Sequence, residues 1–175
     1  MAKKHSEKDS NNNVSHIANL LTSILLCYPE IATINLDPKS RTVKFTFYLS
    51  NGVAKAKLKE FHRHLKESLR AYYYLEKREI EVCSLVFQSL DFFTTIEFQR
   101  DVQTLSQKEI ALIIALIKEE FGSQLVTEED DGLMIDDLSL HEELIGYMLE
   151  NAKRSSSNTK LIALRDEGKV FVFNK

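Results

Sequence analysis

Residues 41–74 read RTVKFTFYLSNGVAKAKLKEFHRHLKESLRAYYY. Apolar and polar side chains alternate over residues 41–50, which is the period of a strand with one buried face. Asn51 and Gly52 interrupt the alternation. From Val53 onward apolar residues recur every three or four positions, which is the period of an amphipathic helix. The stretch therefore predicts a strand that is followed at once by a long helix.

The following segments predict a hairpin and a second helix. Residues 79–90 and 92–100 are rich in β-branched and aromatic residues, which favour strands. Ser106 has Glu109 three residues later, which is the spacing of a capping box. The helix that begins there is apolar all round in its middle and ends at Gly122. Such a helix must be covered by its own chain or by a second subunit, and we take it as a sign of a homo-oligomer.

Short strand candidates at residues 125–126 and 133–135 complete the central pattern. Over residues 41–135 the elements then follow the order strand, helix, strand, strand, helix, strand. That order is the split βαβ, or ferredoxin-like, arrangement. The sequence therefore predicts an α+β fold with a ferredoxin-like βαββαβ core. A competing interpretation is a helix-plus-hairpin unit that repeats from near Ser15, Val53, Ser106 and Ser139.

Further elements flank this core on both sides. Residues 14–27 have helical spacing before Pro29, and residues 31–36 form an extended run. A helix capped by Ser139 and a hairpin around Gly168 are predicted for the C-terminal part. We therefore expect three regions: a disordered polar tail over residues 1–13, a single α+β domain over residues 14–153, and a C-terminal hairpin over residues 154–175 that packs on the same domain.

Composition is typical of a soluble, folded protein of the cytoplasm. The 175 residues are 43% hydrophobic and 28% charged, and they are enough for one domain. Cys27 and Cys83 lack any metal-binding or redox spacing and are expected as small buried side chains. The apolar segments are too short to cross a bilayer, and residues 1–13 lack the apolar core of an export signal. We expect a cytoplasmic location and no membrane partner.

Charge is distributed unevenly along the chain. The formal net charge is −3, so no global attraction to nucleic acid or to an anionic membrane is expected. Lys and Arg outnumber Asp and Glu by 15 to 11 over residues 1–100, whereas Asp and Glu outnumber them by 15 to 8 over residues 101–175. Such an asymmetry serves partner binding or subunit pairing in some proteins and has no role in others.

A basic stripe follows the helix predicted after Gly52. Its cations recur at spacings of four, four, three and four residues, and a tyrosine ring lies at its end. The candidate polyanion-binding residues are Lys55, Lys59, Arg63, Lys66, Arg70 and Tyr73. A row of cations about one helical turn apart matches a line of anions, and the ring can stack on a base. The same pattern is typical of a solvated helix face, because Glu60 and Glu67 lie among the cations.

The sequence offers no local motif that is specific for metal binding or catalysis. His62 and His64 would point about 200° apart on a helix, so they cannot share one metal ion. The acidic run at residues 128–137 is no calcium loop, because Thr127 and Leu138 would occupy its first and last ligand positions. The five glycines are too dispersed to build a phosphate-binding loop. We therefore predict no catalytic residue, no cofactor and no metal, and we lean against an enzyme.

Two hypotheses of function follow from these features. The first is a non-enzymatic binding module whose basic stripe contacts nucleic acid or an acidic protein. The alternative is an oligomeric structural or regulatory domain that acts through an apolar protein–protein interface. That interface would be built on the apolar helix of residues 110–117 or on the sheet face of Lys44, Thr46 and Tyr48.

Overall fold

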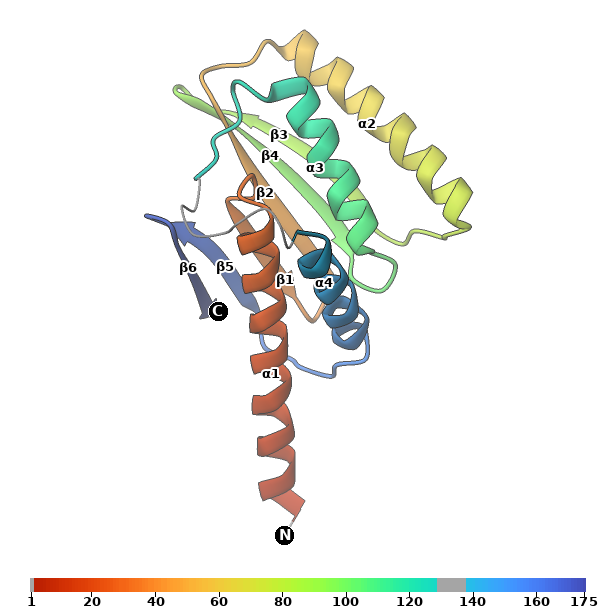
Figure 1. The fold of residues 1–175 in the computed structure, drawn as a ribbon, viewed down its shortest axis with the longest axis vertical. Coiled ribbons are helices and arrows are strands. Elements are labelled where there is room, and N and C mark those ends of the chain that lie inside the picture. The colour runs from red at the N-terminus through yellow and green to blue at the C-terminus, as the bar shows by residue number, and fades with distance from the viewer. Residues whose placement is uncertain (1, 129–137) are drawn as a thin grey trace.

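Helix-plus-hairpin units recur along the chain in this computed structural model, which describes residues 2–128 and 138–175 (Figure 1). The elements in chain order are α1 (Ala2–Cys27), β1 (Thr33–Asp37), β2 (Thr42–Ser50), α2 (Lys55–Glu76), β3 (Cys83–Ser89), β4 (Phe93–Asp101), α3 (Gln107–Phe121), α4 (Leu138–Lys153), β5 (Leu161–Asp166) and β6 (Lys169–Asn174). Within the described ranges, α1, α2 and α4 each precede a hairpin, whereas no hairpin follows α3. The repeat therefore holds for the units predicted near Ser15, Val53 and Ser139, but not for the one near Ser106.

The three hairpins join into one antiparallel sheet with the strand order β3-β4-β2-β1-β5-β6. Phe45 of β2 pairs with Phe98 of β4, and Phe47 pairs with Ile96. All four side chains are buried on one face of the sheet, and the helices cover that face (Figure 1). The hydrophobic core therefore fills the space between one sheet face and the helix layer, and in the described part of the chain no helix covers the other face.

The fold class is α+β, as predicted, but the ferredoxin-like arrangement is not confirmed. That arrangement needs a strand after α3 on the free side of β2. The structure places β1 there instead, and within the described residues 122–128 that follow α3, Leu125 forms an isolated bridge with Leu49 but no strand. The other strand candidate, at residues 133–135, lies outside the described residues. A turn of four residues connects β1 to β2, so this pairing closes a short loop at little cost in chain entropy.

The apolar helix α3 is covered by its own chain. Ile110, Ile113, Ile114 and Ile117 are buried in the main core, while Ala115 is exposed. α3 lies between α2 and α4 over the sheet, and those neighbours supply the contacts that its apolar sides require (Figure 1). The apolar pattern of this helix is therefore explained within one subunit and gives no evidence for a second.

The two ends of the chain are placed differently from each other. α1 begins at Ala2, so residues 2–13, expected as a tail, form helical turns that extend beyond the sheet (Figure 1). The C-terminal hairpin belongs to the main sheet, because β5 pairs with β1. Its turn at Glu167 and Gly168 has positive φ at both residues, as expected for a two-residue hairpin loop with Gly.

Among the described helices, none combines the length and apolar content needed to cross a membrane.

Candidate functional site

The basic stripe lies on α2, whose apolar face packs at one edge of the sheet. Leu58, Phe61, Leu65 and Leu69 are the buried residues of this helix. The Phe61 ring lies 6.3 Å from the Phe87 ring of β3 and 4.8 Å from the Phe121 ring of α3, measured between centroids. α2 therefore rests on the edge strand β3 on one side and on α3 on the other.

The contacts of two side chains show which way the stripe faces. Lys57 points toward α3, where its Nζ lies 3.8 Å from a Glu120 carboxylate oxygen and 5.2 Å from the Phe121 ring centroid. His62 lies on the other side, with its ring 6.0 Å from the Phe87 ring of β3. At about 100° per residue, Lys55, Lys59, Lys66 and Arg70 all lie within about 80° of His62, and Lys57 lies about 140° away. The stripe therefore faces away from α3 and overhangs the edge of β3.

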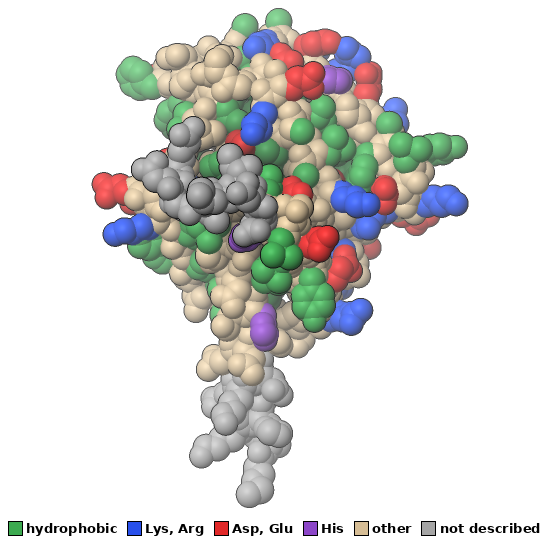
Figure 2. Space-filling view, viewed as in Figure 1, with side chains coloured by type: hydrophobic (Ala, Val, Ile, Leu, Met, Phe, Trp, Pro, Cys, Tyr) green, Lys and Arg blue, Asp and Glu red, His purple; other side chains and the backbone are tan. Residues whose placement is uncertain are grey.

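Four cations of the stripe are open to solvent. Lys55, Lys59, Lys66 and Arg70 are exposed, and no hydrogen bond or ion pair in the described part of the chain involves their side chains. Arg63 differs, because it donates to the carboxylates of Glu60 at 2.5 Å and Glu67 at 2.9 Å. These two acids screen its charge. In the space-filling view, blue and red side chains are accordingly mixed along the upper right, where α2 runs (Figure 2).

Tyr73 does not share the surface of the stripe. Its hydroxyl donates a hydrogen bond of 2.6 Å to the Glu109 carboxylate, and its ring lies over the Arg100 guanidinium at 5.4 Å. Burial and the hydrogen bond to Glu109 raise the pKa of Tyr73 far above its usual range. The ring is thus turned into the protein, and it is not available to stack on a base beside the other five predicted residues.

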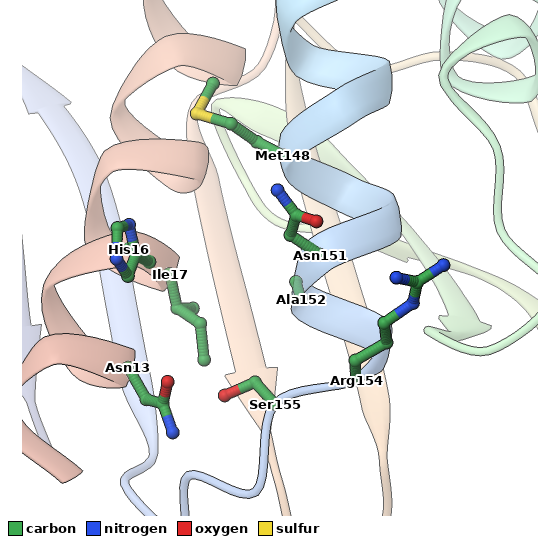
Figure 3. A pocket seen from close by; sticks show the side chains of 8 residues that line it. All are labelled: Asn13, His16, Ile17, Met148, Asn151, Ala152, Arg154 and Ser155. Atoms are coloured by element: carbon green, nitrogen blue, oxygen red, sulfur yellow. The ribbon is translucent and has the colours of Figure 1, made fainter. Parts of the chain in front are cut away.

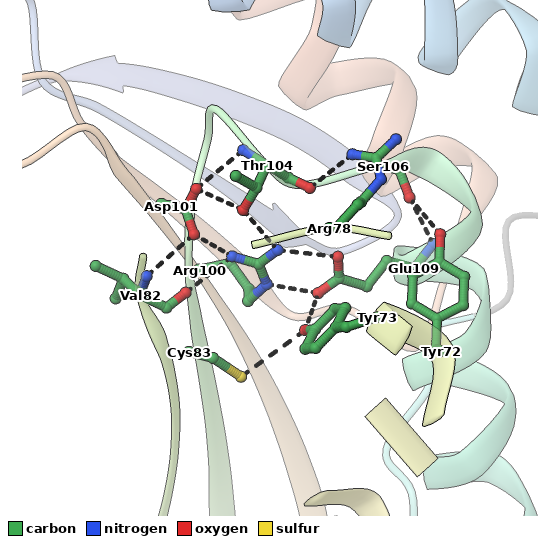
Figure 4. A network of polar contacts seen from close by, with 10 residues as sticks. All are labelled: Tyr72, Tyr73, Arg78, Val82, Cys83, Arg100, Asp101, Thr104, Ser106 and Glu109. Atoms are coloured by element: carbon green, nitrogen blue, oxygen red, sulfur yellow. Dashed lines mark hydrogen bonds and ion pairs between the residues drawn. The ribbon is translucent and has the colours of Figure 1, made fainter. Parts of the chain in front are cut away.

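Beneath the end of α2 lies a buried polar network centred on Arg100 (Figure 4). Arg100 is 0% exposed and binds Glu109, also 0% exposed, through two bonds, from Nε at 2.5 Å and from Nη2 at 3.1 Å. Nη1 donates to the Val82 carbonyl at 2.8 Å and to Asp101, and Nη2 also donates to the Thr104 hydroxyl at 3.0 Å. Each of the five guanidinium N–H groups therefore has an acceptor, which is the condition for burying this charge.

Asp101 extends the network to the loop between β4 and α3. Its carboxylate accepts from the Val82 amide at 3.1 Å and from the Thr104 amide and hydroxyl at 2.9 and 2.6 Å. Burial alone would raise the pKa of Asp101, but these hydrogen bonds and the Arg100 charge outweigh it and lower the pKa below the usual range. The carboxyl is therefore ionised at neutral pH.

Further bonds connect this loop to the end of α2. Tyr72 shares a hydrogen bond of 2.8 Å with Ser106, which caps α3, and Arg78 donates to the Thr104 carbonyl at 2.8 Å. The network thus joins α2, β3, β4 and α3 at one corner of the fold (Figure 4). Its central charges are sealed from solvent, so the arrangement holds the corner in place and offers a substrate no access to these groups.

Neither Arg100 nor Glu109 was predicted as part of a site. Glu109 is explained in the sequence by its place in the capping box, and the structure confirms that its amide bonds to Ser106. Arg100 did carry a signal, because it follows Ile96 and Phe98 at a spacing of two and thus takes a core-facing position on β4. A charged residue in that register needs a buried counter-ion, but the sequence alone does not say which acid supplies it.

The two cysteines are poor nucleophiles. Burial, with a contribution from the Glu142 charge, raises the pKa of Cys27 to about 11. Cys83 is exposed as a residue, yet its thiol lies 3.9 Å from the Tyr73 hydroxyl, and burial raises its pKa as well. Both groups are therefore thiols at neutral pH, and only the thiolate attacks or binds metal. The expectation of two buried side chains holds for neither, since Cys27 is half-buried.

Metal-binding groups do not converge in the described part of the chain. There, no cluster of three or more His, Cys, Asp or Glu side chains is arranged to hold an ion. His62 and His64 are both exposed on α2. Of the acidic run, Glu128 accepts a hydrogen bond of 3.1 Å from the Gly168 amide, and residues 129–137 lie outside the described residues.

A pocket of about 300 Å³ lies between α1 and α4 (Figure 3). Its lining residues are Asn13, His16, Ile17, Met148, Asn151, Ala152, Arg154 and Ser155. Arg154 extends away from α1 in this view (Figure 3). No hydrogen bond or ion pair joins the side chains of any two of these eight residues. The pocket therefore lacks a paired acid and base, and it is a small depression between two helices with a mixed polar and apolar lining.

Comparisons with known proteins supply no relative from which a role can be carried over. No family model, no curated protein and no solved structure matches the chain. The assignment of function therefore rests on the surfaces and contacts of the molecule itself.

Glu109→Gln is expected to destabilise the fold by about 3 kcal/mol, because it leaves the buried Arg100 charge without its bidentate counter-ion. Urea denaturation followed by circular dichroism measures the loss. Glu119→Gln on the exposed side of α3 is the matched control and should change stability by less than about 0.5 kcal/mol. Equal effects of the two substitutions would show that the network does not hold this corner.

Asp101 is expected to make stability depend on pH. Its pKa is lowered in the fold, so its contribution is present above the unfolded value of about 3.9 and is lost as the pH falls through the lower folded pKa. The difference in unfolding free energy between the wild type and Asp101→Asn should therefore be largest near neutral pH and shrink toward pH 3 in urea titrations. A difference that stays constant over this range would contradict the assignment.

Proposed function

We propose that this protein is a non-enzymatic binding module that binds an acidic segment of another protein through the exposed cations of α2. One observation carries the proposal: Lys55, Lys59, Lys66 and Arg70 share one side of the helix and have no counter-ion within the described residues. These four residues are called the basic face below. Acids within reach on α2, Glu60 and Glu67, are engaged by Arg63 instead.

The basic face is more suited to an acidic polypeptide than to nucleic acid. Single-stranded nucleic acid is held by cations together with aromatic rings on which bases stack. Tyr73, the ring predicted for that role, is turned inward and bound to Glu109. The chain also carries a net charge of −3, which opposes the approach of a long polyanion. A short acidic segment meets only the local field of the basic face.

A cytoplasmic setting is proposed together with this function. Cys27 and Cys83 are both free thiols, which fits a reducing compartment, where disulfides seldom persist. A neighbouring protein of that compartment with an acidic segment would be the partner.

The double variant Lys59→Glu/Lys66→Glu should weaken binding of an acidic peptide by about tenfold or more, because two attractive contacts become repulsive. Fluorescence anisotropy measures this with a labelled nonapeptide in which glutamate alternates with valine and threonine. Affinity for the wild type should also fall as salt rises.

Lys39→Glu/Lys169→Glu is the matched control, because it changes the net charge equally at exposed sites away from α2. This control should bind the peptide like the wild type. Equal binding by both double variants would mean that the basic face is only solvated. Tighter binding of a twenty-residue oligo-dT strand than of the peptide, lost in the Lys59→Glu/Lys66→Glu variant, would assign the surface to nucleic acid instead.

The oligomeric alternative is favoured by a different observation, at β6. Phe171 and Phe173 are 40% and 50% exposed, and their rings stack with a centroid separation of 6.3 Å. In the register of the hairpin they share the uncovered sheet face with Leu164 and Ile162. β6 is an edge strand, and such a strand can pair with its own copy about a two-fold axis and continue the sheet. The partner in this alternative is a second copy of the chain.

A homodimer through β6 should give twice the chain mass in light scattering at micromolar concentration. Phe171→Thr/Phe173→Thr should convert it into a monomer, because the substitutions remove the apolar area but retain β propensity. Val86→Thr on the opposite edge strand is the control and should leave the dimer intact. A wild type that is monomeric at all concentrations tested would exclude this alternative.

A further inference from the structure

β3, which the basic face overhangs, is an edge strand with free backbone groups. It pairs with β4 and with no other strand of the described chain. The bonds at the two ends of this ladder are made by Val82 and Leu90, which are even-numbered. Bonding alternates along an antiparallel strand, so the odd-numbered Leu85 and Phe87 direct their N–H and C=O groups away from β4. These groups are positioned to accept another strand.

The side chains of β3 leave that edge open. Cys83–Ser89 contains no charge and no proline, which are the features that usually protect an edge strand from pairing. Leu85 and Phe87 face the helix layer but are only partly buried, whereas their neighbours Phe98 and Ile96 on β4 are buried. The edge of the sheet thus carries partly exposed apolar side chains beside a row of backbone groups that no strand of the described chain pairs with.

α2 runs along this edge of the sheet, antiparallel to β3. His62, early in the helix, lies beside Phe87 near the end of the strand, and Tyr73, late in the helix, lies beside Cys83 at its start. The basic face therefore follows the free edge over most of its length.

The length of the row of cations, and the spacing within each of its two pairs, are close to those of side chains on a strand. Lys55 and Arg70 are separated by about 22 Å of helical rise, and a strand of the seven residues of β3 spans about 23 Å. Alternate residues of a strand are about 6.7 Å apart, close to the rise of about 6 Å from Lys55 to Lys59 and from Lys66 to Arg70. The step from Lys59 to Lys66 is longer, about 10 Å, so acidic side chains at every second position would meet the cations as two pairs, Lys55 with Lys59 and Lys66 with Arg70.

We propose that β3 accepts an extended acidic segment of the partner protein as a seventh strand, with carboxylates on alternate residues directed at Lys55, Lys59, Lys66 and Arg70. The inference rests on the proposed function and adds the mode of binding to it. Main-chain hydrogen bonds to Leu85 and Phe87 supply affinity that does not depend on side chains, and the basic face selects for acid. The other edge strand, β6, carries a single cation of its own, Lys169, at its first position.

Two N-methylated forms of the glutamate nonapeptide test directly whether the peptide binds as an added strand. One carries N-methyl groups on the odd-numbered residues and the other on the even-numbered residues, so each blocks one edge of the strand. One form should bind about tenfold or more weakly than the parent peptide, and the other should bind like the parent, because only one edge pairs with β3. Anisotropy measures both affinities with the full-length protein.

Amide exchange on labelled protein gives the second readout. The amides of Leu85 and Phe87 should exchange quickly in the free protein and become protected by the parent peptide, while those of Ser84 and Val86 should be slow in both states. If both N-methylated forms bind like the parent and exchange does not change, strand addition is wrong and the basic face still binds the acid. If the parent peptide binds the Lys59→Glu/Lys66→Glu variant as it binds the wild type, the proposed function itself fails.

Discussion

The Arg100 guanidinium and the Glu109 carboxylate form a bidentate pair at the corner where α2, β3, β4 and α3 meet. Both groups are removed from water, so the pair is tolerated only because all the remaining N–H groups of Arg100 also find acceptors. One of those acceptors is the backbone of Val82, just before β3. The pair therefore fixes the position of the start of the edge strand β3 relative to α3. Through Tyr73 it also fixes the position of the C-terminal end of α2.

The direction of the basic face follows from this corner. Tyr73 binds Glu109 at the end of α2, and Phe61 packs between Phe87 and Phe121 further toward its start. With its rotation set at both places, α2 turns Lys57 toward α3 and the basic face toward the free edge of β3. The orientation of the surface that we propose for binding thus depends on buried side chains that do not touch the ligand themselves.

Much of the fold could be predicted from the sequence. The alternation at residues 41–50 and the helical spacing after Val53 gave the central strand and α2, because both elements bury one face. The place of β1 beside β2 could not be predicted in the same way, because the pattern shows that a strand exists but not which neighbour it pairs with. The strand order depends on whether β2 pairs with β1, across a short turn, or with a strand after α3, across a long connection.

The placement of the candidate residues could be predicted in part, for a similar reason. Periodicity places Lys55, Lys59, Lys66 and Arg70 on one side of a helix, and they do lie together on the exposed surface. It cannot distinguish Tyr73, which has the same helical position but turns inward to a carboxylate 36 residues further along the chain. It also cannot show that Arg63 is screened by both neighbouring acids, since that depends on rotamers.

The central claim is that the basic face above β3 is the surface a partner covers, and chemical footprinting of lysines tests it without altering the protein. Acetylation of each lysine by an N-hydroxysuccinimide ester, followed by mass spectrometry, is compared with and without saturating glutamate nonapeptide. We expect Lys55, Lys59 and Lys66 to be protected by the peptide, while Lys39, Lys108 and Lys169, which are also exposed, react as before. Protection that is spread evenly over all six lysines, or confined to the second three, would contradict the account.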